Sequence, residues 1–149
     1  MKNALYLLVI FAALSLAGCS SDDDNGGGGH ADSWMTAKID GTEYYFENFT
    51  VEKEVFADYT DLHIVGYMVD MPTHWIEIVV EEGATGPDAS WRFVYYLDGE
   101  AFEKEAGFQT EITENTESTI SGTFSGTVLL HDGTGEPIEM SDGEFSVKR

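Results

Sequence analysis

Strict alternation of apolar and polar residues constrains this fold more than any other sequence feature. It is clearest between Thr119 and His131, where one set of positions is apolar or glycine and the other carries hydroxyl groups: Ile120, Gly122, Phe124, Gly126, Val128 and Leu130 against Ser121, Thr123, Ser125 and Thr127. A period of two is that of a β-strand with one buried face and one face in water. Glycines on the buried face predict a bend or the close packing of another segment.

Similar segments follow one another from Trp34 to Arg149, separated by turn residues about every ten positions. The pairs Asp40-Gly41 and Asp98-Gly99 predict tight hairpin turns. Other turns are expected where polar and turn-forming residues interrupt the pattern: a longer loop over 70–73, a turn at 114–115 and a turn at 141–143, with one turn of helix as an option over 55–60.

Many short strands joined by tight turns predict an all-β domain over 34–149. We expect an antiparallel β-sandwich or a flattened, closed β-barrel of about 8–10 short strands, and alternation alone does not choose between them. If Trp91, Phe93, Tyr95 and Leu97 face the core, Tyr96 faces outward, and Trp75 points outward if its neighbours 76, 78 and 80 fill the core.

The N-terminus reads as an export signal, with Lys2 followed by the uncharged run 4–17. This run is short for a membrane-spanning helix, which needs about 20 residues. The sequence Leu16-Ala17-Gly18-Cys19 resembles the lipobox of bacterial lipoproteins. The resemblance implies cleavage between Gly18 and Cys19, a diacylglycerol on the Cys19 thiol and often an acyl chain, such as palmitate, on the new amine. Two or more chains give stable anchoring.

Cys19 is the single cysteine of the chain, so no disulfide within the molecule competes for it. The alternative is an ordinary signal peptide followed by a chance cysteine. On the lipoprotein interpretation, residues 1–18 are a signal peptide and 19–33 are the lipidated cysteine with an acidic, glycine-rich tether. Thirteen tether residues reach at most about 45 Å when extended.

Acidic residues directly follow the predicted anchor: Ser20, Ser21, Asp22, Asp23 and Asp24. This run resembles the surface-export signal of Bacteroidota lipoproteins, which implies an outer-membrane address with the domain facing the cell exterior. The alternative is a solvated acidic linker, which the same composition would produce.

The charge of the chain excludes some partners. Removing residues 1–18 would take away Lys2 and none of the 28 acidic residues, so the net charge would change from −21 to −22. A body this acidic repels phosphate backbones and anionic headgroups. We therefore expect no nucleic-acid partner and attachment to the membrane through the lipid anchor alone.

Three strings in the body carry a family resemblance: Met35-Thr36-Ala37-Lys38-Ile39-Asp40-Gly41, Ile120-Ser121-Gly122-Thr123-Phe124-Ser125-Gly126 and Ser141-Asp142-Gly143-Glu144-Phe145-Ser146-Val147. In this order they are similar to the strands of a family of small all-β Bacteroidota lipoproteins of unknown function. The resemblance implies a β-domain and supplies no catalytic residues. Gly126 departs from the larger residue expected after Thr-Phe-Ser.

The sequence contains no glycine-rich phosphate loop, no His-Glu-x-x-His zinc motif and no Gly-x-Ser-x-Gly nucleophile motif. The histidines His30, His63, His74 and His131 lie in different segments without ligand spacing. The acidic turn 132–136 does not have the spacing of an EF-hand calcium loop, and calcium at this turn is the alternative to an ordinary polar turn. We expect no metal and no cofactor. A carboxylate pair such as Glu77 and Glu81 would be needed for a glycan-active enzyme, but chance pairs are common in so acidic a chain.

The aromatic residues Trp75, Trp91 and Tyr96 are the candidate ligand contacts, because exposed rings stack on sugars or peptide strands. The alternative is that they pack the core or cap its ends. We therefore expect a non-enzymatic surface lipoprotein that binds or presents an extracellular glycan, peptide or protein. The alternatives are a lipocalin-like carrier of a small apolar ligand and a glycan-active enzyme.

Overall fold

The computed structural model describes residues 33–149, which form ten β-strands and no helix. Their bounds are β1 Trp34–Ile39, β2 Thr42–Val55, β3 Thr60–Met68, β4 Met71–Glu81, β5 Gly86–Pro87, β6 Ser90–Leu97, β7 Glu100–Lys104, β8 Gln109–Asn115, β9 Thr119–Leu130 and β10 Ile138–Lys148. The predicted all-β class is confirmed. Within the described range, no helix has the length and hydropathy that a membrane crossing requires.

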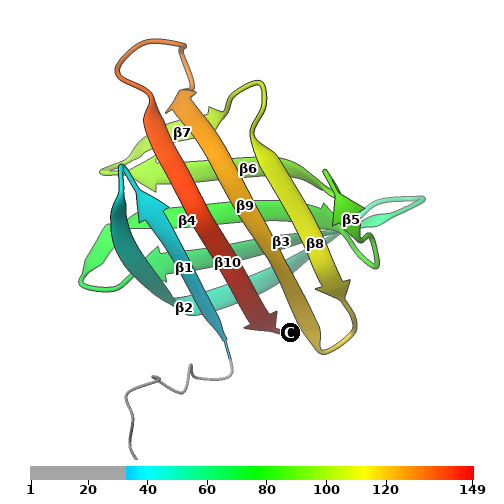
Figure 1. Cartoon of the computed structure of the whole chain (residues 1–149). Coiled ribbons are helices and arrows are strands. Elements are labelled where there is room, and N and C mark those ends of the chain that lie inside the picture. The colour runs from blue at the N-terminus through cyan, green and yellow to red at the C-terminus, as the bar shows by residue number, and fades with distance from the viewer. Residues whose placement is uncertain (1–32) are drawn as a thin grey trace, which may run out of the picture.

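Eight of the strands close into an antiparallel barrel, in the order β1-β2-β3-β4-β6-β7-β9-β10, because β10 pairs with both β9 and β1. In Figure 1, β1, β10, β9 and β8 cross in front of the strands of the opposite wall. Of the two predicted architectures, the closed barrel is the one that forms. Because β10 meets both β1 and β9, no strand of the ring is a terminal strand of the sheet.

Strand β9 has two partners along one edge. Its first half pairs with β8, and its last residues pair with β7. The two-residue strand β5 covers part of the outer edge of β8 (Figure 1). The glycines on the buried face of β9 admit these neighbours, since a Cβ on Gly122 would lie 2.4 Å from the Glu111 carbonyl oxygen. The predicted close packing at these glycines is confirmed.

The inside of the barrel is packed with apolar side chains. Phe93 is almost fully buried, and its ring centroid lies 4.5 Å from that of Phe108 and 4.8 Å from that of Phe124. A Cβ on Gly126 would lie 2.7 Å from the Phe108 Cα, so Phe108 fills the space of the side chain that Gly126 lacks. This is why the string beginning at Ile120 ends in glycine.

Both predicted Asp-Gly hairpins are confirmed. Asp40 and Gly41 join β1 to β2, and Asp98 and Gly99 join β6 to β7. All four residues have positive φ, between 47° and 90°. Two-residue hairpin turns with this backbone twist match the twist of the flanking strands.

The hairpin predicted around residues 70–73 forms between β3 and β4, but its loop is shorter than predicted. Strand β4 begins at Met71, which pairs with Met68 across a two-residue turn where Asp70 has a φ of 63°. Pro72 lies before His74, the first β4 residue that pairs with β6, so its missing N–H costs no hydrogen bond to that strand.

Three more local predictions are corrected. The turn predicted at 141–143 is a bulge inside the continuous strand β10, because the register with β9 shifts between Met140 and Gly143 while both neighbouring strands continue past it. The turn predicted at 114–115 belongs to β8, and the reversal follows at 116–118. The helical option over 55–60 is wrong, since β2 runs through Val55 and β3 begins at Thr60.

Candidate functional site

Two of the three candidate aromatic residues lie side by side on the outer wall. Trp75 and Tyr96 are cross-strand partners, and their rings stack with centroids 3.6 Å apart and planes 11° apart. Tyr67 lies next in the same row, with its ring centroid 6.2 Å from that of Trp75. These half-buried rings contact one another, so the row stabilises the sheet as a cross-strand ladder.

Trp91 lies elsewhere, five residues before Tyr96 on β6 and therefore about 16 Å away. The prediction that Trp91 faces the core is wrong, because 54% of its surface is exposed. The register between β4 and β6 shifts at this point: Val79 pairs with Arg92, and Val80 pairs with Ser90. Trp91 is the extra residue of this bulge, and the small Ser90 is buried beside it.

The outward Trp91 forms the wall of a hollow of about 300 Å³ that Tyr59, Asp61 and Glu81 also line. Its indole N–H donates to Asp61 Oδ1 at 3.3 Å. Exposed apolar side chains gather around the hollow. Of the five large hydrophobic side chains that are exposed in residues 33–149, three lie at the β2–β3 turn and a fourth is Trp91 itself: Val55, Phe56, Tyr59 and Trp91.

Two acidic residues of neighbouring strands line this hollow, one of them buried (Asp61) and one exposed (Glu81). Asp61 on β3 and Glu81 on β4 are cross-strand partners, and Asp61 is 2% exposed. Within residues 33–149, neither carboxylate forms an ion pair. Like charges directly opposite on a sheet destabilise it, and a buried charge without a counterion costs more. The hollow is therefore a site of uncompensated negative charge beside aromatic rings.

The next carboxylate along the outer wall is paired. The Glu77 carboxylate lies 3.1 Å from His63 Nδ1 and 3.5 Å from Arg92 Nη2. The other ring nitrogen of His63, Nε2, lies 3.2 Å from a Glu54 carboxylate oxygen. Glu77 lies four residues before Glu81 on the same strand, about 13 Å away along the backbone. The structure thus assembles Asp61 with Glu81, and not the pair Glu77 and Glu81.

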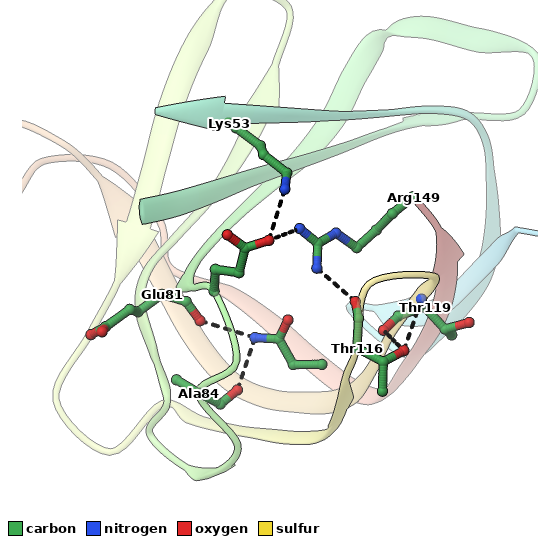
Figure 2. Close-up of polar contacts among 8 residues, drawn as sticks. Lys53, Glu81, Ala84, Thr116, Thr119 and Arg149 are labelled. Carbon is green, nitrogen blue, oxygen red and sulfur yellow. Dashed lines mark hydrogen bonds and ion pairs between the residues drawn. The ribbon is translucent and has the colours of Figure 1, made fainter. Parts of the chain in front are cut away.

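The end of β4 that carries Glu81 is held by polar contacts (Figure 2). Asn115 Nδ2 donates to the backbone oxygens of Glu81 at 2.9 Å and of Ala84 at 3.0 Å. Glu82 accepts from Lys53 Nζ at 2.8 Å and from Arg149, and these bonds hold the pKa of the Glu82 carboxyl below its usual value. Figure 2 shows the Glu81 carboxylate directed away from Lys53 and Arg149.

A second hollow of about 350 Å³ lies against Trp91, lined also by Arg92, Phe93, Glu103 and Lys104. Lys104 Nζ donates to the Ser90 carbonyl at 3.1 Å, which ties the strand on this side of the indole. Trp91 therefore separates a hollow lined by acidic residues from a second hollow lined by both basic and acidic residues.

In the acidic turn at 132–136, the first carboxylate accepts hydrogen bonds from within the turn itself. Asp132 Oδ1 accepts from the Thr134 backbone N–H at 2.8 Å and from its hydroxyl at 2.5 Å. These bonds hold the pKa of Asp132 below its usual value. Residues 33–149 contain no group of three or more His, Cys, Asp or Glu side chains arranged to hold a metal ion.

The predicted lipidation site Cys19, the cleavage position at Gly18 and the acidic leader from Ser20 to Asp24 lie outside the described residues. Tyr59 and Asp61 are site residues that the sequence reasoning missed. Their signals were present as an aromatic residue in a turn and a carboxylate at the start of a strand. Their partners depend on the β3–β4 register and on the β6 bulge, which alternation does not specify.

Comparison of the chain with family models, with curated proteins and with solved structures found no significant match to any of them.

Proposed function

We propose that this chain is a lipid-anchored, non-enzymatic lipoprotein of the bacterial outer membrane, facing the cell exterior, whose β-barrel binds an extracellular ligand. The observation that carries the binding role is the hollow beside Trp91, where exposed aromatic rings adjoin two carboxylates without a counterion. Exposed rings beside polar groups are a common feature of ligand sites. The anchor part of the proposal rests on the sequence up to Cys19 and on the acidic leader.

The filled interior favours binding on the outer wall over the carrier alternative. A lipocalin-like carrier needs space inside its barrel. Here the interior holds contacting rings of Phe93, Phe108 and Phe124. We therefore place the ligand outside the barrel.

One observation favours a second candidate, a glycan-active enzyme. Asp61 and Glu81 are cross-strand partners, and glycoside hydrolases act with a pair of carboxylates. Incubating the protein and its Glu81→Gln variant with a glycan panel tests this candidate, because hydrolysis by the parent chain alone would replace the binding role with an enzymatic one.

The anchor and its address can be tested on intact cells. We expect metabolic labelling of the chain with an alkyne fatty acid, and loss of both the label and the membrane association in Cys19→Ser. We also expect added protease to remove the domain from intact cells. If the protease removes the domain only after the outer membrane is broken, the proposed location on the cell surface is wrong, whereas the proposed lipid anchor is not contradicted.

The binding role is tested on glycan and peptide arrays. Trp91→Leu removes the ring beside Asp61, so we expect the variant to lose binding to the array ligands. Trp75→Leu alters the aromatic ladder about 16 Å away, so we expect it to bind the same ligands with about the affinity of the parent chain. Equal loss in both variants would mean that the Trp91 hollow is not the binding site.

A further inference from the structure

The polar groups of the Trp91 hollow are almost all hydrogen-bond acceptors. The Asp61 and Glu81 carboxylates accept only, and the Trp91 indole N–H is already donated to Asp61. The Tyr59 hydroxyl is the one lining side-chain group able to donate to a ligand. A ligand that fits here must therefore bring donors. Ammonium carries three and guanidinium five, and neither carries an acceptor.

The charge of the hollow also favours a cation. Asp61 is 2% exposed and lies opposite Glu81, and the cations of the surrounding strands are used elsewhere: Lys53 binds Glu82, and Arg92 lies against Glu77. A cation between the two carboxylates would relieve their repulsion and compensate the buried charge.

The aromatic walls suit the same group. Trp91 and Tyr59 are about half exposed, and both rings line the hollow. Cations are attracted to the face of an indole or phenol ring, and most strongly to indole. An aliphatic stem next to the charged group would cover the exposed apolar surface of Phe56, whose ring is stacked on Tyr59 with centroids 4.6 Å apart.

We infer that the hollow lined by Tyr59, Asp61, Glu81 and Trp91 binds a primary ammonium or guanidinium group carried on an aliphatic stem. The inference rests on the proposed binding function and names its ligand chemistry. A free amine and the lysine or arginine side chain of a peptide present the same group. A neutral sugar would leave the charge of the two carboxylates uncompensated.

The test uses the chain carrying Cys19→Ser, which removes the anchor, and follows the three tryptophan indole N–H signals by NMR, with Trp91→Phe assigning the Trp91 signal. We expect n-butylammonium and methylguanidinium to shift the Trp91 signal saturably, while 1-butanol and methyl glucoside do not. Acetyl-Gly-Lys-Gly-amide and its Lys→Gln analogue form the peptide arm. If the lysine peptide binds about tenfold more tightly than n-butylammonium, the source is a peptide, and equal affinities indicate a free amine.

Glu81→Gln and Asp61→Asn keep the shape of the hollow and remove one charge each, and Asn at 61 still accepts from the indole. We expect each to weaken n-butylammonium binding about tenfold, whereas Glu111→Gln, an exposed carboxylate on β8 with the same charge change, leaves it unchanged. Binding should also weaken as salt rises from 50 to 500 mM.

Two results would overturn the inference. If methyl glucoside shifts the Trp91 signal and the ammonium probe does not, the hollow binds a neutral ligand, and the proposed binding function stands without a cationic ligand. If no probe shifts the signal, the ligand class is wrong, and the array experiment with Trp91→Leu then decides whether the hollow binds anything.

Discussion

At the scale of single residues, the hollow beside Trp91 combines features that reduce stability. Asp61 is a buried carboxylate without an ion pair in the described part of the chain, Glu81 lies directly opposite, and Trp91 exposes half of its surface. Such features are usual where a site is prepared for a ligand, because the missing partner arrives with the ligand. Removing them should therefore stabilise the free protein.

The Glu81→Gln variant tests how much the pair of like charges at Asp61 and Glu81 reduces the free energy of unfolding. Neutralising Glu81 removes the like charge opposite Asp61, so we expect the free energy of unfolding to rise by about 0.2–1 kcal/mol, the usual size of a cross-strand pair effect. Urea unfolding of the ligand-free protein measures it. Glu111→Gln is the matched control, since the partners of Glu111 across the sheet are Pro87 and Thr123. Equal gains in the two variants would assign the effect to net charge and not to the Asp61–Glu81 pair.

Tyr95 gives a second residue-scale prediction, on the opposite face of β6. Its hydroxyl lies 3.3 Å from His74 Nδ1, and burial, with smaller contributions from Tyr44, Asp98 and Asp40, raises the pKa of Tyr95 to about 12. The folded protein thus disfavours the phenolate. This contribution to stability is fully present below pH 10, the ordinary tyrosine value, and is lost as the pH rises toward 12.

Denaturant unfolding between pH 9 and 12 is the measurement. We expect the parent chain to lose stability more steeply above pH 10 than Tyr95→Phe, which has no proton to lose. Phenolate absorbance at 295 nm should show one tyrosine that titrates last and is absent from the variant. Parallel stability curves for the two proteins above pH 10 would contradict the assignment.

At the scale of the elements, glycines set how closely the strands approach. A Cβ at Gly122 of β9 would lie 2.4 Å from the backbone oxygen of Glu111 and about 3.0 Å from the ring of Phe145. A backbone oxygen inside the β8–β9 ladder has little freedom to move. The contact explains why a strand of otherwise large buried residues carries glycine there.

Gly122→Ala should therefore destabilise the barrel by about 1–3 kcal/mol, the typical cost of overpacking. Thermal unfolding compared with Thr123→Ser, an exposed change one residue away on β9, gives the measurement. We expect the control to stay within about 0.5 kcal/mol of the parent chain. A Gly122→Ala variant as stable as the control would show that β8 moves aside without cost.

Turns were predictable from their residues where no neighbouring strand pairs across them. Asp40-Gly41 and Asp98-Gly99 form the expected hairpins because positive φ is intrinsic to these residue pairs. Ser141-Asp142-Gly143 has the same local chemistry, and Asp142 indeed has a φ of 51°. Because β1 and β9 pair with β10 on both sides of this string, the positive φ is taken up in a bulge and not in a chain reversal.

At the scale of the whole molecule, the antiparallel order gathers distant segments at one end of the barrel. The start of β1, the β2–β3 turn, the end of β4 and the start of β6 all lie at this end, and so do the β8–β9 turn and Arg149. Figure 1 shows the chain entering β1 near the C-terminus. The Trp91 hollow is thus at the same end of the barrel as the start of β1.

The sequence by itself determined the strand class and the Asp-Gly hairpins, because period-two burial and the turn geometry of Asp-Gly pairs are local properties of the chain. At the buried-face glycines of β9 it left a bend and close packing as alternatives, and the pairing with β8 decided for close packing at Gly122. The expectation of a lipid anchor at Cys19 also rests on local residues and stays a prediction. The tertiary structure decided between sandwich and barrel, since closure depends on β10 meeting both β1 and β9. It also decided the site: Asp61 meets Glu81, and Trp91 turns outward, only through the strand register and a bulge, which arise from pairing between segments far apart in the chain.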